Sequence, residues 1–189
     1  MSKRFEICLA GSGGQGVITA AVMIGEAASI CCDGLFAVQT QSYGPEARGG
    51  SAKAEVVISD VEIDYPKPVH PDLMICLTGA AADKYAKEVK EGGRLILDSF
   101  TVQQIPEIEA IVYHLPIIET AREKIGREIV TNMVALGMVA RVLELEKIME
   151  PESLRKAMMN RVPKGTEELN SKAFEEGYQM FKDTPAHFY

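Results

Sequence analysis

The sequence predicts an α/β fold of three layers (α/β/α), in which helices cover both faces of a mostly parallel sheet. Short apolar runs typical of strands alternate with longer helical stretches, and a glycine-rich loop joins the first strand to the first helix. After Pro116 several helical stretches follow one another, which predicts a helical C-terminal segment. Parallel sheets favour such alternation, because each crossover helix returns the chain to the same edge of the sheet.

The strands are expected where β-branched and other apolar residues form short runs between glycine, proline or polar residues. Three prolines between positions 66 and 71 require an extended connector there. The expected strands cover residues 5–10, 35–39, 51–59, 61–65, 73–77, 94–98 and 111–115.

The helices are expected where apolar residues recur with helical spacing and good helix formers dominate. They cover residues 15–32, 80–90, 119–125, 131–145, 151–160 and 166–181. A chain of 189 residues has the length of one ordinary domain. We therefore expect residues 1–189 to form a single domain with a helical C-terminal extension over about 151–189.

Charge, cysteine spacing and the N-terminal residues exclude several classes of protein. Lys plus Arg is 20 and Asp plus Glu is 27, so the net charge of −7 argues against non-specific binding to nucleic acid or anionic membranes. Four cysteines without a Cys-x-x-Cys spacing offer no recognisable zinc or iron–sulfur site, and favour reduced, mostly buried thiols. The N-terminal apolar run is too short for a signal peptide, and glycines interrupt the uncharged stretch that follows. A cytoplasmic protein is expected.

The glycine loop (residues 11–16) reads Gly-Ser-Gly-Gly-Gln-Gly and lies between an expected strand and an expected helix. This is the context of a dinucleotide-type, Rossmann-like loop, whose helix N-terminus attracts an anion. The second strand, however, ends without the acidic residue that holds the ribose of NAD. Either the glycines only let the helix cross the strand closely, or the loop binds some anion. The candidate cofactor-binding residues are Gly11, Gly13, Gly14, Gln15 and Gly16.

The second loop (residues 42–50) reads Ser-Tyr-Gly-Pro-Glu-Ala-Arg-Gly-Gly. It follows the carboxyl end of a strand, which is where open α/β sheets bind ligands. Its Arg48 can form two parallel hydrogen bonds with a carboxylate or phosphate, or it can pair with a local acid such as Glu46. Further along, Asp98 and Ser99 end a strand, and they either cap the next segment or face the same crevice.

Both loops, together with the expected strand at 53–59 that leads to Asp60, resemble the gamma subunits of the 2-oxoacid:ferredoxin oxidoreductases. The resemblance extends from residue 5 to about residue 181 and is greatest to the 2-oxoglutarate type. Gamma subunits of the pyruvate and branched-chain types share the second motif, so the resemblance leaves open which 2-oxoacid is used.

The resemblance implies a subunit of a complex that oxidatively decarboxylates a 2-oxoacid to an acyl-CoA. Thiamine diphosphate and the iron–sulfur clusters are then held by alpha, beta and ferredoxin-like delta subunits, ferredoxin is the acceptor, and this chain contains no catalytic residue and is inactive alone. No Gly-Asp-Gly thiamine motif occurs in the chain, in agreement with that division. The residues expected to shape the active-site entrance or an interface are Tyr43, Gly44, Pro45, Glu46, Arg48, Gly49 and Gly50.

Two other functions compete with this interpretation. The glycine loop by itself would suit a free-standing nucleotide- or flavin-binding oxidoreductase, although the missing acid after the second strand counts against it. A non-catalytic scaffold, whose glycine loop holds no ligand, is the other alternative.

Overall fold

The computed structural model describes residues 4–43, 51–183 and 187–188. Within these ranges the strands are β1 Arg4–Ser12, β2 Phe36–Tyr43, β3 Ser51–Ser59, β4 Leu73–Cys76, β5 Arg94–Asp98, β6 Ile111–Leu115 and β7 His187–Phe188. The helices are α1 Val17–Cys31, α2 Gly79–Tyr85, α3 Ile117–Glu119, α4 Thr131–Leu145, α5 Pro151–Arg161 and α6 Glu167–Asp183. The short helices are η1 Ala86–Glu88, η2 Thr120–Lys124 and η3 Glu128–Val130, of which η2 is a π-helix.

The strands form one seven-stranded sheet with the order β2-β3-β1-β4-β5-β6-β7. Strands β1, β4, β5 and β6 are parallel neighbours, whereas β3 is antiparallel to both β1 and β2, and β7 is antiparallel to β6. Strands β1 and β2 therefore point the same way, with β3 between them. The expected α/β architecture with a mostly parallel sheet is confirmed.

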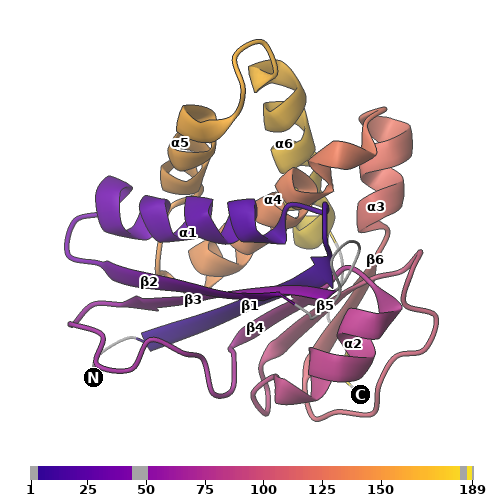
Figure 1. Cartoon of the computed structure of the whole chain (residues 1–189), viewed down its shortest axis with the longest axis horizontal. Coiled ribbons are helices and arrows are strands. Elements are labelled where there is room, and N and C mark those ends of the chain that lie inside the picture. Colours follow the sequence, from indigo (N-terminus) through magenta and orange to yellow (C-terminus); the bar gives the residue numbers. More distant parts are fainter. Residues whose placement is uncertain (1–3, 44–50, 184–186, 189) are drawn as a thin grey trace.

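Helices cover both faces of this sheet (Figure 1). On one face α1 packs on β2 and β3, while α5 packs on α1 and α6 packs on α4. On the other face α2 packs on β1 and β4. Buried side chains accordingly form two clusters, a large one beneath α1 and α4 and a smaller one beneath α2. The alternation of side chains along each strand separates the two cores: Ile7 and Leu9 enter the first, and Cys8 and Ala10 the second.

Helices α4 and α6 cross with no side chain between their backbones. A Cβ atom built on Gly137 of α4 would lie 2.7 Å from the backbone nitrogen of Tyr178, and one built on Gly177 of α6 would lie 2.7 Å from the carbonyl carbon of Val134. Such a separation is possible only with glycine at both positions. The crossing holds the C-terminal helix on the first core, where Phe174 is fully buried.

Several elements differ from those expected. The strand expected at 61–65 is wrong: these residues form bends and irregular backbone, because the extended connector turns away beneath the sheet. The helix expected from residue 119 begins at Ile117 and continues as a π-helix, and the two-residue strand β7 was not expected. The elements expected at 51–59 and 131–145 are confirmed to the residue.

Among the helices of the described residues, none has the length and apolar character needed to cross a bilayer.

Candidate functional site

The glycine loop lies at the carboxyl edge of the sheet, between the end of β1 and the start of α1. Its chain reverses at Gln15, whose backbone N–H donates to the Ser12 carbonyl over 3.2 Å. Gly16 precedes the first turn of α1 with a φ of 70°, a conformation that glycine adopts without strain. Gly13 and Gly14 are exposed at the tip, so this part of the loop faces outward.

The Gln15 side chain folds back over the loop. Its Oε1 accepts a hydrogen bond from the Ser12 N–H at 2.8 Å, and its Nε2 lies 3.5 Å from the Leu77 carbonyl, to which it donates. The carboxamide occupies the space that a side chain on Gly11 would need. A diphosphate resting against Gly11 would therefore have to displace Gln15, and the inner half of the loop does not fit a dinucleotide in this conformation.

Asn132, which the sequence analysis did not single out, closes the other side of the loop. It lies in the first turn of α4, only 8% exposed, and its Nδ2 donates to the Gly16 carbonyl at 3.3 Å. A Cβ atom on Gly16 would approach the Asn132 Cγ to 2.8 Å. The sequence signal for this residue was an asparagine directly before the apolar run at 133–140, because an amide buried there needs a hydrogen-bond partner.

The loops after β4, β5 and β6 are joined by a second polar cluster at the same edge. Asp98 at the end of β5 is fully buried and accepts hydrogen bonds from the backbone N–H groups of Thr101 and Ile118, each at 2.9 Å. The Thr101 hydroxyl donates to the Leu77 carbonyl at 2.9 Å, which Gln15 also reaches. Of the two alternatives for Asp98, the structure shows the capping role.

The carboxyl end of β2 lies at this same edge of the sheet. Tyr43, the last residue of β2, pairs with Ala52, and Ser12 at the end of β1 pairs with Ser51, so one strand separates the two strand ends. The carboxyl ends of β1 and β2 therefore lie near each other. The predicted site residues Gly44, Pro45, Glu46, Arg48, Gly49 and Gly50 lie outside the described residues.

A charge cluster lies on the α2 side of the sheet, and sequence reasoning missed it. Lys53 Nζ is 2.8 Å from a Glu55 carboxylate oxygen, 2.6 Å from one of Glu88, and 4.9 Å from the centre of the Tyr85 ring. Burial alone would lower the pKa of Lys53, but its hydrogen bonds to the two carboxylates raise that pKa above the ordinary value. The cluster joins β3 to the end of η1. Lys53 and Glu88 are 35 positions apart, so no local sequence pattern indicated the cluster.

The cysteines are free thiols. Cys8 and Cys76 are fully buried, and burial raises the pKa of Cys8 well above its usual value and that of Cys76 to about 12. Cys31 and Cys32 are half-buried at the end of α1. Neutral, buried thiols are poor metal ligands. Within the described ranges no group of three or more His, Cys, Asp or Glu side chains could hold a metal ion.

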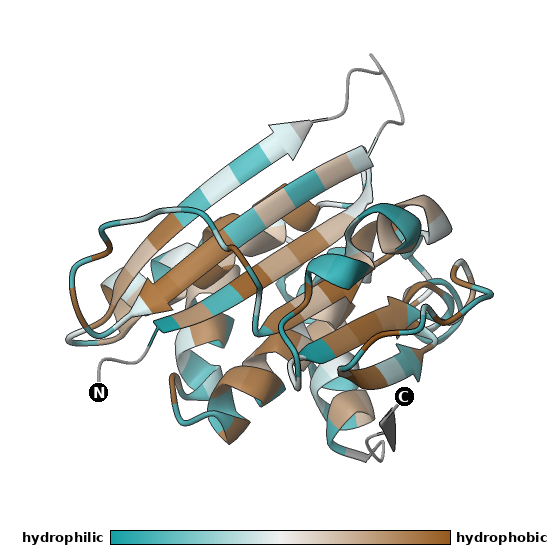
Figure 2. Ribbon diagram, turned by 90° about the horizontal axis from the view of Figure 1, so that it is seen from below, coloured by the Kyte–Doolittle hydropathy of each residue, from teal (hydrophilic) through white to brown (hydrophobic). Residues whose placement is uncertain are grey.

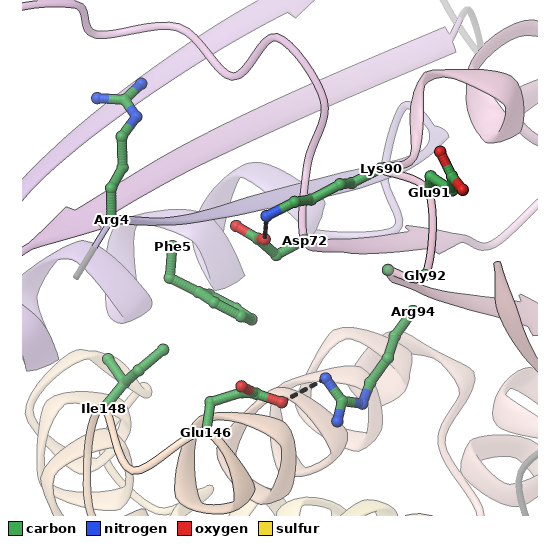
Figure 3. Close-up of a pocket in the computed structure, with 10 residues that line it drawn as sticks. Arg4, Phe5, Asp72, Lys90, Glu91, Gly92, Arg94, Glu146 and Ile148 are labelled. Atoms are coloured by element: carbon green, nitrogen blue, oxygen red, sulfur yellow. Dashed lines mark hydrogen bonds and ion pairs between the residues drawn. The ribbon is translucent and has the colours of Figure 1, made fainter. Parts of the chain in front are cut away.

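A hollow lies at the opposite, amino-terminal edge of the sheet (Figure 3). It has a volume of about 430 Å³ and contains two ion pairs, Lys90 with Asp72 at 2.8 Å and Arg94 with Glu146. Figure 3 shows Lys90 pointing at Asp72 and Arg94 pointing at Glu146. These mutually neutralising pairs fix the starts of β4 and β5. None of the predicted site residues that the structure describes lines the hollow.

The sequence matches the pyruvate ferredoxin/flavodoxin oxidoreductase domain family over residues 6–180. The chain belongs to this family. It is 48% identical, over 95% of both chains, to the 2-oxoglutarate synthase subunit KorC of Methanocaldococcus jannaschii. It is 45% identical to the KorC subunit of Methanothermobacter marburgensis over 95% of this chain and 98% of that one.

Solved structures agree with the family assignment. The gamma subunit of a keto/oxoacid ferredoxin oxidoreductase from Geobacter sulfurreducens superposes with a TM-score of 0.84 at 44% identity, over 95% of this chain and 99% of that one. A 2-oxoglutarate:ferredoxin oxidoreductase from Magnetococcus marinus superposes with a TM-score of 0.83 at 22% identity, over 97% of this chain and 32% of that one, and shows the shared fold. The resemblance to gamma subunits of this oxidoreductase family, seen in the sequence, is confirmed.

Proposed function

We propose that this chain is the gamma subunit of a 2-oxoglutarate:ferredoxin oxidoreductase, a complex that oxidatively decarboxylates 2-oxoglutarate to an acyl-CoA. The observation that carries the proposal is the identity of 45–48% over 95% of the chain with two 2-oxoglutarate synthase subunits. A ketoisovalerate oxidoreductase subunit is 30% identical over 82% of this chain, which makes a branched-chain 2-oxoacid the weaker assignment. We further place the complex in the cytoplasm.

The cofactors belong to partner subunits in this proposal. Thiamine diphosphate and the iron–sulfur clusters are carried by the alpha, beta and delta subunits, CoA joins the reaction in the assembled enzyme, and ferredoxin accepts the electrons. The described part of this chain supports such a division, because its two fully buried thiols are held neutral and Gln15 fills the inner half of the glycine loop. Because Gln15 already fills this half of the loop, a free-standing enzyme that binds a dinucleotide there is disfavoured.

We propose that this chain contributes the carboxyl edge of its sheet as a rigid surface, and no reacting group. The exposed tip at Gly13 and Gly14 and the second loop from Tyr43 to Gly50 would face the catalytic subunits and shape the entrance to their active site. Support comes from the register, which brings the ends of β1 and β2 to one edge, and from the bracing of the glycine loop by Gln15 and Asn132. We also propose one domain over 1–189, with 151–189 as its helical extension.

An assay of the assembled complex tests the assignment. The chain is purified anaerobically from its host with its bound subunits, and 2-oxoglutarate, pyruvate and 2-oxoisovalerate are each offered with CoA and a viologen dye. We expect co-purifying thiamine- and cluster-bearing subunits and fast dye reduction with 2-oxoglutarate. Recovery of the chain alone, or preference for another acid, would contradict the proposal.

Arg48→Ala is expected to raise the KM for CoA or for the 2-oxoacid at least about tenfold in the assembled enzyme. Loss of a charge-assisted hydrogen bond to an anionic group removes roughly 1.5–3 kcal/mol of binding. Steady-state kinetics of the purified complex give KM and kcat separately. Lys164→Ala, which removes an exposed cation outside the loop, is the matched control, and unchanged constants in the Arg48→Ala enzyme would exclude the role proposed for Arg48.

A further inference from the structure

The two edges of the sheet differ in whether a further strand covers them. At one margin the outer edge of β6 is covered by β7, in which Phe188 pairs with Ile111 and His187 pairs with Val112. At the other margin β2 is the last strand, and within the described ranges only β3 pairs with it. Seen from below, β2 runs along the open border of the sheet (Figure 2). Alternate residues of this eight-residue strand therefore present their backbone N–H and C=O groups outward, while the others bond to β3.

Strand β2 lacks the features by which proteins usually keep an open edge from pairing. Charged side chains, proline, a bulge or a very short strand serve this purpose. Residues 36–43 read Phe-Ala-Val-Gln-Thr-Gln-Ser-Tyr, without charge or proline. The register with β3 is unbroken from Phe36 opposite Ser59 to Tyr43 opposite Ala52, so no bulge occurs. An edge of this length and composition is suited to receive another strand.

A hollow lies one strand in from this edge, next to the start of β2, on the face opposite α1. It measures about 380 Å³ and is formed by the ends of β1 and β3 together with the connector that follows β3. The connector is tied to β1, because Arg4 Nη2 donates to the Tyr65 carbonyl at 2.9 Å and the Val69 N–H donates to Glu6 at 3.0 Å. The hollow is thus built by hydrogen bonds between segments far apart in the sequence.

Exposed apolar side chains surround this hollow. Val61, Tyr65 and Val69 line it and are 48%, 56% and 60% exposed. Phe36, which is 49% exposed, stands opposite Ser59, another lining residue. Apolar side chains gathered beside an open strand are typical of a protein contact surface.

The charge around the hollow indicates the chemistry of the partner. Glu62 and Asp64 line it, while Arg4, the one basic lining residue in the described part of the chain, is already paired with Glu6 at 2.8 Å. A second copy of this chain, with a net charge of −7, would bring like charges together at the same place. A segment with an apolar side chain next to lysine or arginine is complementary.

We propose that the outer edge of β2 pairs with an extended segment of another subunit of the enzyme complex, and that the adjacent hollow receives an apolar side chain of that segment flanked by basic residues. The inference rests on the proposed function, since that function supplies the partner subunits. Main-chain hydrogen bonds along β2 would provide affinity, and the hollow would provide specificity.

The test is co-expression of the full chain with the other subunits, followed by measurement of the fraction that co-elutes on size exclusion. Phe36→Lys combined with Gln41→Lys places ammonium groups on the edge at two exposed positions. We expect at least a tenfold loss of assembled complex, with the thermal midpoint of the isolated chain unchanged. The matched control is Ile30→Lys, an apolar side chain 75% exposed at the end of α1, which should assemble as the wild type does.

Three results would overturn the inference. The double variant could assemble normally, the Ile30→Lys control could lose assembly equally, or sedimentation of the isolated wild-type chain could show a dimer that the double variant abolishes. In the last case the occupant is a second copy. Failure of the wild-type chain itself to assemble would overturn the proposed function, and this inference with it, so the two failures are distinguishable.

Discussion

Gly137→Ala is expected to destabilise the protein by about 3 kcal/mol, because the added methyl group must force two helix backbones apart. The atoms it meets belong to the backbone of α6 at Phe174 and Tyr178, so no rotation of a side chain can relieve the clash. Gly177→Ala should have a similar effect, since its methyl group meets the backbone of α4 at Val134. For a domain of this size, the thermal midpoint should fall by about 6–12 °C.

The control for this prediction is Gly25→Ala in α1. A Cβ atom there has its nearest neighbour at 3.9 Å, an ordinary contact. Alanine in the middle of a helix is favoured over glycine by roughly 0.5–1 kcal/mol, so this variant should be slightly more stable than the wild type. Urea unfolding of the three variants measures the difference. A Gly137→Ala protein as stable as Gly25→Ala would show that the α4–α6 crossing is looser than described.

Gly16→Ala is expected to cost about 2–3 kcal/mol through backbone strain and displacement of a buried amide. The φ of 70° disfavours alanine, and the new methyl group would meet the Asn132 side chain. In an Asn132→Ala background most of the second cost disappears, because the Asn132 Nδ2 and Cγ atoms are gone and only its Cβ remains close, at 3.2 Å. The double-mutant cycle should therefore give a coupling of at least about 1 kcal/mol.

Function gives a second measurement for the same pair. If the glycine loop must keep its position for the enzyme to assemble or bind CoA, Gly16→Ala should weaken the complex or raise the KM for CoA. This effect should be seen at temperatures at which the variant is still folded. Asn132→Asp keeps the size of the side chain but replaces the donating Nδ2, and tests whether the hydrogen bond to the Gly16 carbonyl matters. Additive energies in the cycle would contradict the contact on which both predictions depend.

Local patterns predicted most of the fold. The strand expected at 51–59 and the helix expected at 131–145 agree with β3 and α4 because their apolar periodicity is long and uninterrupted. The strand expected at 61–65 is wrong, because its apolar residues have no neighbouring strand and lie instead in a connector tied to Arg4 and Glu6. Strand β7 has two residues, too few for any pattern to reveal.

By itself the sequence determined the α/β class, the strand–loop–helix context of the glycine loop and the resemblance to the gamma subunits. These depend on residue types close together in the chain. Only the tertiary structure decided that Gln15 and Asn132 fill the glycine loop, that Asp98 caps two segments, and that β2 is left as the open edge of the sheet. Asn132 and Gly16 are 116 residues apart, and a contact over such a distance depends on how the helices pack, which no local pattern encodes.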